Sequence, residues 1–339
     1  MRAAVLYGPG AFDAFVLEQV PIPQIDPDDA LVRVKACGVS YRDIVERNGT
    51  YRRDVTFPLI IGIEISGQVV ATGALVSDLA VGDHVCTKAF SSCGRCRLCR
   101  TGRESTCLKR QPVRGGYAEY VALPQDAFVK VSDEIPYEKS CGLGPGAGVA
   151  LNAVRDAARI SIGETVLITG ASGGVGIPAV QIAKAAGAKV IASTRNESKR
   201  AILRECGADE VLVGPADDRL VAEVRRITRG SGVDVVLDTV GSAVFHAAFN
   251  SLAVHGRYAV IGQLNADKTS INLARIFFKR AAIIGVGSVS RVQLEDAAEL
   301  TVRGIVRPQI SRILPLEQVA EAHRLVEEGA IAGRVVLQP

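Results

Sequence analysis

A glycine-rich turn is the first stretch of this sequence whose residues could do chemistry. Residues 171–176 (ASGGVG) follow an apolar run at 165–169 and precede a helix-like apolar pattern that continues to Ala186. A buried strand, a tight turn and a helix in this order bring backbone N–H groups and the positive end of a helix dipole close to a pyrophosphate. A second apolar run at 189–193 completes the spacing of a βαβ unit. We therefore predict a dinucleotide site, with a turn that holds no ligand as the alternative. The predicted contacts are Ser172, Gly173, Gly174 and Val175.

Four cysteines form the second candidate site. Cys93, Cys96, Cys99 and Cys107 are spaced C-x2-C-x2-C-x7-C. Four thiolates at such short separations fold one loop around a tetrahedral ion, and a shell of four sulfurs is typical of a structural zinc. We predict one structural zinc per chain, which would hold together a lobe at 91–108 that has no core of its own. Four free thiols are the alternative, and the basic residues around the lobe are expected to form a solvated face.

The elements that must position these sites follow two patterns. Residues 1–145 alternate short strands with Gly- and Pro-rich turns, which is typical of a compact β-rich domain. Strands and helices then alternate as far as residue 287, which favours an α/β fold with a doubly wound sheet of six parallel strands. Two helices from about Gln293 and a last strand at 333–337 are expected to pack back onto the first domain. The other expected strands are 2–6, 30–36, 66–72, 83–87, 117–123 and 127–131 in the first domain, and 165–169, 189–193, 210–213, 233–238, 256–261 and 281–286 in the second.

The composition narrows the classes of function. With 339 residues, 48% of them hydrophobic and 22% charged, the chain is long enough for two packed domains. A net charge of +4 without interleaved basic and aromatic residues argues against nucleic acid as a partner. No apolar run reaches the roughly 18 residues that indicate a membrane span. The N-terminus lacks the layout of a signal peptide, so we expect a cytoplasmic protein that does not bind membranes.

Several motifs together make the chain resemble the medium-chain dehydrogenase/reductase superfamily, which includes the zinc alcohol dehydrogenases and the quinone oxidoreductases. Besides the glycine turn and the four-cysteine lobe, the motifs are 62–67 (GIEISG), 81–85 (VGDHV) and 333–337 (GRVVL). The resemblance covers essentially the whole chain. It implies a GroES-like catalytic domain at 1–145 and 288–339, and a Rossmann dinucleotide-binding domain at 146–287. These motifs do not fix the substrate.

The resemblance does not extend to the catalytic metal of the zinc alcohol dehydrogenases. In those enzymes a second zinc polarises the oxygen of the alcohol or carbonyl, and its ligand positions correspond here to Ser40, Ile63 and Gly146. None of these three residues can hold zinc. Glu64 alone does not make a site of three protein ligands. The resemblance therefore implies an enzyme without catalytic zinc.

Residues 40–45 (SYRDIV) are similar to a segment of enoyl reductases and quinone oxidoreductases of this superfamily. The acryloyl-CoA-reductase-like branch has the same Tyr-Arg-Asp sequence. This similarity implies reduction of a small-molecule carbonyl or a conjugated enone or quinone, with an acryloyl-CoA-type enoyl reductase as an alternative. Such groups accept hydride without a metal when donors stabilise the oxygen and a proton is supplied.

The side chains of this segment can be given roles in that chemistry. Tyr41 is best suited to donate both a hydrogen bond and a proton, and Ser40 is second. Arg42 can hold a developing oxyanion, with Asp43 and Glu64 orienting it. A buried ion-pair cluster of the last three residues, which would only brace the site, is the alternative. Further tyrosine candidates are Tyr7, Tyr51 and Tyr117.

The end of the second strand of the dinucleotide domain indicates which cofactor is used. An acidic residue there would bind the adenosine ribose, but the sequence has none before Glu197. It has hydroxyls at Ser193 and Thr194 and cations at Arg195 and Lys199, which suit a 2′-phosphate. We therefore predict NADP(H) rather than NAD, unless the two cations only decorate a helix start. The resemblance also implies cofactor contacts further along the chain, at Val240, Gly262 and Gln263.

Two other functions remain open from the sequence. The first is a zinc-dependent alcohol dehydrogenase with a shifted metal site that uses Cys37 or Cys141, although we interpret both as buried thiols. The second is an NADPH-binding protein without turnover, in the manner of the lens crystallins of this family. The apolar strand at 281–286 resembles the edge through which family members pair their sheets, so a homodimer or homotetramer is expected.

Overall fold

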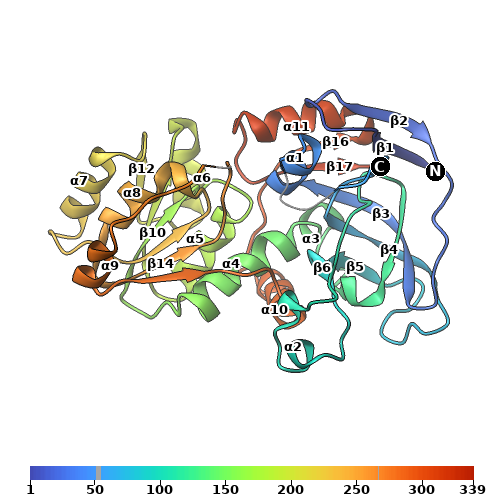
Figure 1. The fold of residues 1–339 in the computed structure, drawn as a ribbon, viewed down its shortest axis with the longest axis horizontal. Coiled ribbons are helices and arrows are strands. Elements are labelled where there is room, and N and C mark those ends of the chain that lie inside the picture. The colour runs from blue at the N-terminus through green and yellow to red at the C-terminus, as the bar shows by residue number, and fades with distance from the viewer. Residues whose placement is uncertain (51–54, 266) are drawn as a thin grey trace. The chain divides into compact units, whose positions relative to one another are not determined.

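The computed structural model describes residues 1–50, 55–265 and 267–339, so Tyr51 lies outside the described residues. The chain divides into two compact units. Unit 1 consists of Met1–Gly148, Ser288–Gly304 and Pro308–Pro339, and unit 2 of Val149–Gly287 and Ile305–Arg307. The first boundary thus follows Gly148, where the sequence analysis places it after residue 145. Figure 1 labels elements of both units.

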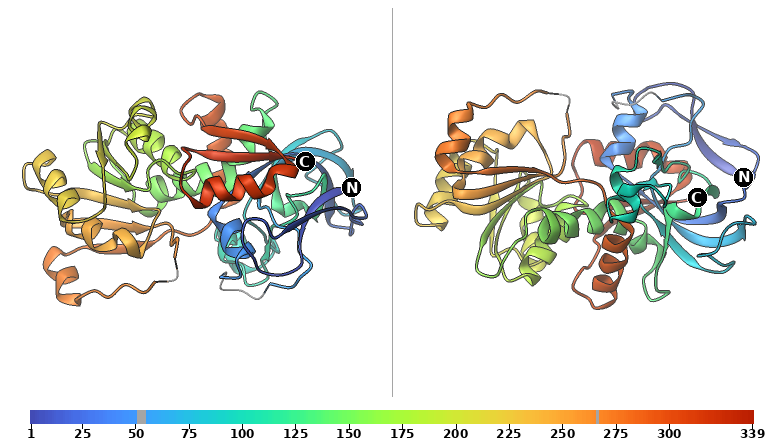
Figure 2. Two further views of the ribbon diagram at one scale, coloured as in Figure 1. Left: turned by 90° about the horizontal axis from the view of Figure 1, so that it is seen from above. Right: turned by 60° about the horizontal axis from the view of Figure 1, so that its bottom comes forward.

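Unit 2 contains a sheet of six parallel strands, which confirms the predicted doubly wound fold. The strand order is β12-β11-β10-β13-β14-β15, so the first strand of the unit, β10 (Thr165–Thr169), lies inside the sheet. Residues Val166 to Thr169 are buried on both sides of the strand, because helices cover both faces. Figure 2 shows these helices from two further directions. The other strands of the unit are β11 (Lys189–Thr194), β12 (Glu210–Val213), β13 (Val233–Asp238), β14 (Leu252–Val260) and β15 (Ala282–Gly285).

The helices of unit 2 follow the strands in regular alternation. The ten-residue helix α5 runs from Gly176 to Ala185 between β10 and β11. The remaining helices are α4 (Val149–Leu151), α6 (Arg200–Glu205), α7 (Asp218–Ile227), α8 (Ser242–Asn250) and α9 (Leu273–Lys279). Their order produces the βαβ crossovers that the sequence pattern predicts.

Unit 1 is built on a sheet with the strand order β16-β17-β3-β4-β5-β9, with β8 also paired to β3. The 11-residue strand β3 (Asp29–Val39) buries alternate residues Ala30, Val32 and Val34 and then runs into the interior, where its last four residues are all buried. The final strand, β17 (Arg334–Gln338), pairs antiparallel with the end of β3 and so joins the C-terminal segment to this unit. The helix α1 (Tyr41–Arg47) begins directly beyond β3.

The other elements of unit 1 are short. Its strands are β1 (Arg2–Leu6), β2 (Phe15–Gln19), β4 (Glu64–Thr72), β5 (His84–Thr87), β6 (Phe90–Ser91), β7 (Gln111–Pro112), β8 (Tyr120–Pro124), β9 (Phe128–Lys130) and β16 (Ile310–Pro315). Its helices are α2 (Arg97–Arg100), α3 (Tyr137–Ser140), α10 (Arg291–Val302) and α11 (Val319–Glu327). None of the helices described in either unit has the length and apolar composition to cross a membrane.

Candidate active site and cofactor site

The glycine turn of unit 2 has the close packing that a dinucleotide site needs. Gly170 follows β10 with a φ of +60°, and α5 starts at Gly176. A Cβ atom on Gly176 would lie 2.3 Å from the carbonyl oxygen of Gly170, so only glycine lets the helix begin this close to the strand. A Cβ on Gly173 would lie 3.3 Å from the same oxygen. Since the first N–H groups of a helix have no acceptor within it, the turn fits a pyrophosphate.

The carboxyl ends of the neighbouring strands place the other predicted cofactor residues at the same sheet edge. β11 lies on one side of β10 and β13 on the other, so the strand order reverses between β10 and β13, and ligands of such sheets bind at that point. Val240 and Gln263 follow β13 and β14. The amide oxygen of Gln263 accepts a hydrogen bond from the N–H of Ser242 at 3.1 Å. A Cβ on Gly262 would lie 2.6 Å from the carbonyl oxygen of Thr239, so this loop passes close to its neighbour.

Asp238, at the end of β13, is a positioning residue that the sequence analysis does not identify. It is 1% exposed and accepts hydrogen bonds from the hydroxyls of Thr169 and Tyr258, both at 2.6 Å. It also accepts from the backbone N–H groups of Val240 at 2.9 Å and Gly241 at 3.1 Å. One carboxylate therefore ties β10, β14 and the loop after β13 together. The signal in the sequence is an acidic residue at the end of an otherwise apolar strand.

The end of β11 brings two cations together. Ser193 and Thr194 are buried, Arg195 is exposed, and Lys199 is 8% exposed. The pKa of Lys199 lies below its usual value because of burial and because of the charge of Arg195. Glu197 binds Arg200 instead, with 3.0 Å between the guanidinium and the carboxylate. The positive charge at this strand end is consistent with a phosphate ligand.

The four cysteines of unit 1 are arranged as zinc ligands. Their sulfur atoms all lie within 4.8 Å of one another. The Cys96–Cys99 distance is 3.4 Å, Cys93–Cys107 is 3.6 Å, and Cys93–Cys99 and Cys96–Cys107 are both 3.9 Å. Tetrahedral zinc with bonds of about 2.3 Å requires sulfurs about 3.8 Å apart. Backbone N–H groups lower the pKa of Cys93 and of Cys96, which favours the thiolate form that zinc needs, whereas burial raises the pKa of Cys99. The donor set fits a structural zinc.

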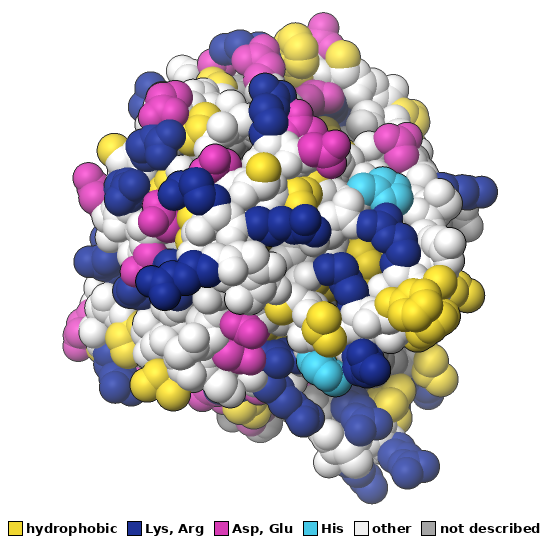
Figure 3. Space-filling view, turned by 90° about the vertical axis from the view of Figure 1, so that its left-hand side faces the viewer, with side chains coloured by type: hydrophobic (Ala, Val, Ile, Leu, Met, Phe, Trp, Pro, Cys, Tyr) yellow, Lys and Arg dark blue, Asp and Glu magenta, His cyan; other side chains and the backbone are white. Residues whose placement is uncertain are grey.

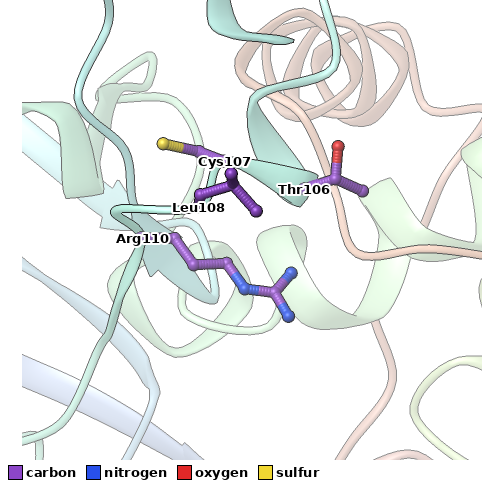
Figure 4. A pocket seen from close by; sticks show the side chains of 4 residues that line it. All are labelled: Thr106, Cys107, Leu108 and Arg110. Carbon is purple, nitrogen blue, oxygen red and sulfur yellow. The ribbon is translucent and has the colours of Figure 1, made fainter. Parts of the chain in front are cut away.

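A hollow of about 320 Å³ opens beside this lobe. In Figure 4, the sulfur of Cys107 points away from the guanidinium of Arg110. That guanidinium lies 4.6 Å from the ring centroid of Phe90, and Arg42 lies 5.3 Å from the same ring. The hollow belongs to the lobe and is lined by Thr106, Cys107, Leu108 and Arg110.

The segment from Ser40 to Asp43 turns β3 into α1. Ser40 precedes the helix, and both its N–H and its hydroxyl donate to Oδ2 of Asp43 at 2.7 Å. This arrangement satisfies a backbone donor at the helix start and fixes both side chains. Ser40 is 5% exposed and Asp43 is fully buried, whereas Tyr41 and Arg42 are half-buried. The segment therefore presents two hydroxyls and one guanidinium around a buried carboxyl group.

The predicted orientation of Arg42 by Asp43 and Glu64 is wrong, and so is the alternative ion-pair cluster. Arg42 binds Glu46, one helical turn later, with 3.0 Å between Nε and Oε1. Arg114 also contacts this buried carboxylate, at 3.3 Å. The i,i+4 spacing of Arg42 and Glu46 was the signal that could have revealed the first pair.

Glu64 at the start of β4 is paired at a much greater distance in the sequence. Its Oε1 accepts from Arg334 of β17 at 2.6 Å. Burial raises the pKa of Glu64, and the Arg334 charge opposes that rise. Within the described parts of the chain, Oδ1 of Asp43 and Oε2 of Glu64 are buried atoms that have no hydrogen-bond partner. Burial raises the pKa of Asp43 to about 7, against the two hydrogen bonds from Ser40.

The hydroxyls of the two further tyrosine candidates that the structure describes have partners outside this segment. Tyr117 is fully buried, and its hydroxyl lies 2.9 Å from Nε2 of His323. Arg47 lies 3.2 Å from the other ring nitrogen and can only donate, so that nitrogen accepts a hydrogen bond from the guanidinium and His323 is neutral. Burial and the Arg47 charge lower the pKa of His323 to about 3. Tyr7 is 59% exposed and donates to Glu18, so both hydroxyls are already engaged.

The residues around α1 and β4 do not fit a catalytic zinc. Among residues 1–50, 55–265 and 267–339, only the lobe cysteines bring three or more metal-binding side chains together. Cys37 and Cys141, which a shifted site would need, are both fully buried, and burial raises the pKa of each thiol above its usual value. The positions of Ser40, Ile63 and Gly146 offer one hydroxyl and no other donor side chain.

Comparison with known proteins identifies the family. Residues 26–133 match the alcohol dehydrogenase GroES-like domain, and residues 174–303 match the zinc-binding dehydrogenase family. An acryloyl-coenzyme A reductase of Sulfurisphaera tokodaii is 33% identical over 344 residues, covering 100% of both chains. The crystal structure of AibC is 38% identical with a TM-score of 0.93, covering 100% of this chain and 96% of that one. A putative zinc-binding dehydrogenase of Sinorhizobium meliloti 1021 bound to NADP is 30% identical with a TM-score of 0.87, covering 100% and 99%.

These similarities include both units. Other relatives are named alcohol dehydrogenase and quinone oxidoreductase. The chain therefore belongs to the medium-chain dehydrogenase/reductase superfamily and is an oxidoreductase of the alcohol dehydrogenase type.

Proposed function

We propose that this oxidoreductase is an NADPH-dependent reductase that saturates a C=C bond conjugated to a carbonyl group, without a catalytic metal. The observation that carries this proposal is the set of residues at the ligand positions of the zinc alcohol dehydrogenases, which are Ser40, Ile63 and Gly146. The similarity to an acryloyl-coenzyme A reductase supports thioesters of short α,β-unsaturated acids as the first substrates to test. Carbonyl compounds and quinones form the second class.

The residues of the chain divide the work in the following way. When bound, the reduced nicotinamide supplies the hydride. The turn at 172–175 would bind the pyrophosphate, because its glycines and the start of α5 leave backbone donors available. Arg42, which Glu46 holds in place, would stabilise negative charge on the substrate carbonyl oxygen. Ser40 and Tyr41 are the two hydroxyl donors of the segment.

The preference for NADPH over NADH is supported by the charges at the end of β11. Arg195 is exposed there, and Lys199 is close enough for the two cations to influence each other. The nearest acidic residue, Glu197, is engaged by Arg200. A phosphate on the adenosine ribose would therefore meet positive charge, whereas a bare ribose would lack a carboxylate partner.

Consumption of NADPH tests this function. The purified chain is mixed with NADPH and, in turn, with acryloyl-CoA, crotonyl-CoA, an enone, a quinone and an aryl ketone. The proposal expects the fastest oxidation of NADPH with an enoyl-CoA and none with saturated acyl-CoA as the matched control. Alcohol oxidation that needs an added divalent metal would overturn it. Tight NADPH binding with no turnover of any compound would favour a cofactor-binding protein instead.

We also propose that unit 2 mediates self-association. Among the strands of the described residues, the edge strand β15 is paired only to β14, and Ile283 on it is 42% exposed. Nearby in the sequence, α9 exposes Leu273, Phe277 and Phe278 by 70%, 62% and 70%. Figure 3 views the side of the molecule on which α9 lies, and hydrophobic side chains gather on its right among Lys and Arg. An apolar edge of this kind is typical of a subunit interface.

A further inference from the structure

Asp43 differs from the two other buried carboxylates near the start of α1. Glu46 is paired with two arginines and Glu64 with one. Asp43 is 0% exposed and, in the part of the chain that the structure describes, has no cationic partner. Its Oδ2 accepts the two bonds from Ser40, and its Oδ1 has no partner within the same residues. An ionised Asp43 would thus be a buried charge without a counter-charge.

The acidic groups around Asp43 favour its protonated form. Glu46 on the same helix and Glu64 on β4 carry negative charge and raise its pKa. Burial raises the pKa of the Cys37 thiol of β3 and of the Tyr117 phenol, which precedes β8, and the charge of Asp43 raises both further, so these two acidic groups lie near it. A cluster of acidic groups in one apolar region holds protons, because each further negative charge is costly there. The opposing effect comes from the two hydrogen bonds of Ser40.

Ser40 provides the one polar route from this buried carboxyl group that the described residues show. Its hydroxyl lies 2.7 Å from Oδ2 of Asp43, and the residue is 5% exposed while Asp43 is not exposed at all. A hydroxyl both donates and accepts, so it can pass a proton outward while receiving another. Among the described residues, no buried carboxyl group is hydrogen-bonded to Tyr41, the other hydroxyl of the segment.

We propose that Ser40 and Asp43 form a proton-delivery pair, in which Ser40 protonates the substrate and Asp43 resupplies Ser40. This proposal rests on the proposed reduction of a conjugated C=C bond. After hydride has added to the β-carbon, the electron pair of the enolate forms a C–H bond at the α-carbon. The O–H bond of Ser40 breaks, a new O–H bond forms at Ser40 Oγ, and the O–H bond of Asp43 breaks. Asp43 is left as a carboxylate, whose Oδ2 accepts a hydrogen bond from the Ser40 hydroxyl, and it regains its proton from water by way of Ser40. Asp43 acts only through Ser40 and does not touch the substrate.

Kinetics of matched variants test the pair. With the best enoyl-CoA substrate, Asp43→Asn and Ser40→Ala should each lower kcat by roughly 10²-fold with little change in KM, since general acid catalysis contributes about that much. The double variant should lose no more than either single one, because the two residues act as a unit. Tyr41→Phe should lower kcat less than Ser40→Ala does. Asp28→Asn makes the same chemical change at an exposed position and should behave as wild type. Wild-type kcat in Asp43→Asn, or a larger loss in Tyr41→Phe than in Ser40→Ala, would overturn the proposal.

The pH profile separates proton supply from a structural role. Wild-type kcat should fall as pH rises through about 7, where Asp43 loses its proton. Asp43→Asn should lack this limb, and a limb that persists would contradict the pair. If Asp43→Asn does not fold, Ser40→Ala and the wild-type profile decide in the same way.

An infrared measurement tests proton storage without turnover, so it distinguishes failure of this inference from failure of the proposed function. The band of a protonated carboxylic acid should be present in the wild type at pH 6, vanish by pH 8, and be missing in Asp43→Asn. Absence of that band from the wild type at pH 6 would overturn the inference even for an active reductase. Its presence in a chain that reduces no substrate would instead count against the proposed function.

Discussion

Two regions of unit 1 correspond to the two metal sites of the zinc alcohol dehydrogenases, and they are built in opposite ways. In the lobe, four cysteines from one short stretch place their sulfurs 3.4 to 3.9 Å apart. Around α1 and β4, the corresponding positions come from three distant parts of the chain and hold Ser40, Ile63 and Gly146. The charges of this second region are balanced by arginines at Glu46 and Glu64 and, we propose, by a proton at Asp43. The same unit therefore carries four sulfur ligands in one place, whereas the corresponding positions in the other place offer a single hydroxyl.

This contrast teaches that a local zinc motif and a catalytic metal are independent features of the fold. The lobe can be stabilised by its ion whatever happens at α1, because all its ligands lie between residues 93 and 107. The pairing of β3 with β4 depends on backbone bonds and on buried apolar residues, not on a metal ligand. Whether a metal can bind at the ends of these two strands depends on the side chains at those positions.

The largest expected effect is the loss of the lobe. Cys96→Ser removes one of four zinc ligands, so zinc should no longer co-purify and the free energy of unfolding should drop by several kcal/mol, of the order expected for a structural zinc site. Metal analysis and urea unfolding measure both. Cys206→Ser, which changes a buried thiol of unit 2, is the control and should keep the zinc. Full zinc content in Cys96→Ser would contradict the claim that the four cysteines of the lobe bind the zinc.

Removing a counter-charge from the second region should have the next largest effect. Arg334→Met leaves Glu64 buried without its cation, which costs roughly 3–5 kcal/mol. Thermal or urea unfolding at pH 7 measures this loss. The double variant Arg334→Met/Glu64→Gln should recover most of it, because the unpaired charge is gone. An unchanged stability accompanied by a bound divalent cation would show that this region does accept a metal.

The pH dependence of stability should reveal Asp43 separately. The pKa of this residue is raised from 3.8 to about 7 in the folded chain. Its contribution to stability is therefore complete below about pH 4 and is lost as the pH rises to about 7. Relative to Asp43→Asn, the wild type should become less stable over that range by roughly 4 kcal/mol, because each pKa unit of the shift is worth about 1.4 kcal/mol. A constant difference between pH 4 and 8 would contradict a protonated Asp43.

His323 has the opposite dependence on pH, so the Asp43 test needs the variant as its reference. Its pKa is lowered from 6.5 to about 3. The stability that neutral His323 contributes is therefore complete above about pH 6.5 and is lost as the pH falls toward 3. The wild type alone would show the sum of both effects, whereas the difference from Asp43→Asn isolates one.

A smaller effect is expected at the cofactor site. Arg195→Ala should weaken NADPH binding about tenfold, since one charge-assisted hydrogen bond to a phosphate is lost, and should leave NADH binding unchanged. Fluorescence titration with both cofactors measures the ratio. Arg204→Ala alters an exposed arginine of α6 and should change neither affinity. An equal loss of affinity for NADPH and NADH would contradict the proposed contact between Arg195 and the 2′-phosphate.

The smallest effect on the subunit itself is expected at α9. The double variant Phe277→Ser/Phe278→Ser should shift the chain toward monomers without lowering the stability of the fold, because both rings are exposed. Sedimentation over a range of concentrations measures this shift. Leu108→Ser, at a 94% exposed position of the lobe, should leave the oligomeric state unchanged. A wild type that is monomeric at all concentrations would count against the interface.

Patterns that lie within one stretch of the sequence were predictable. The six parallel strands are set by apolar runs, and β10, β12 and β13 have the predicted bounds. The four-cysteine spacing identified the lobe. By contrast, β14 begins at Leu252 rather than at residue 256, and β16 was missed because this edge strand is largely exposed and lacks an apolar run.

Contacts between distant residues were not predictable from one sequence. Nothing near Glu64 indicates that its partner is Arg334, 270 positions later. The pairing of Arg42 with Glu46 was accessible from helical spacing, whereas the burial of Asp43 without a cation depends on how the whole unit packs. The raised pKa values of the buried carboxyl groups in the candidate site therefore depend on tertiary contacts that one sequence does not reveal.

The zinc content of the purified chain tests the central claim most directly. Metal analysis by mass spectrometry on protein of known concentration, repeated after dialysis against excess zinc, gives the number of ions per chain. The account predicts one zinc per chain, lost in Cys96→Ser and kept in Ser40→Ala. Two zinc ions per chain, with the second lost in Glu64→Gln and the activity lost with it, would contradict the account.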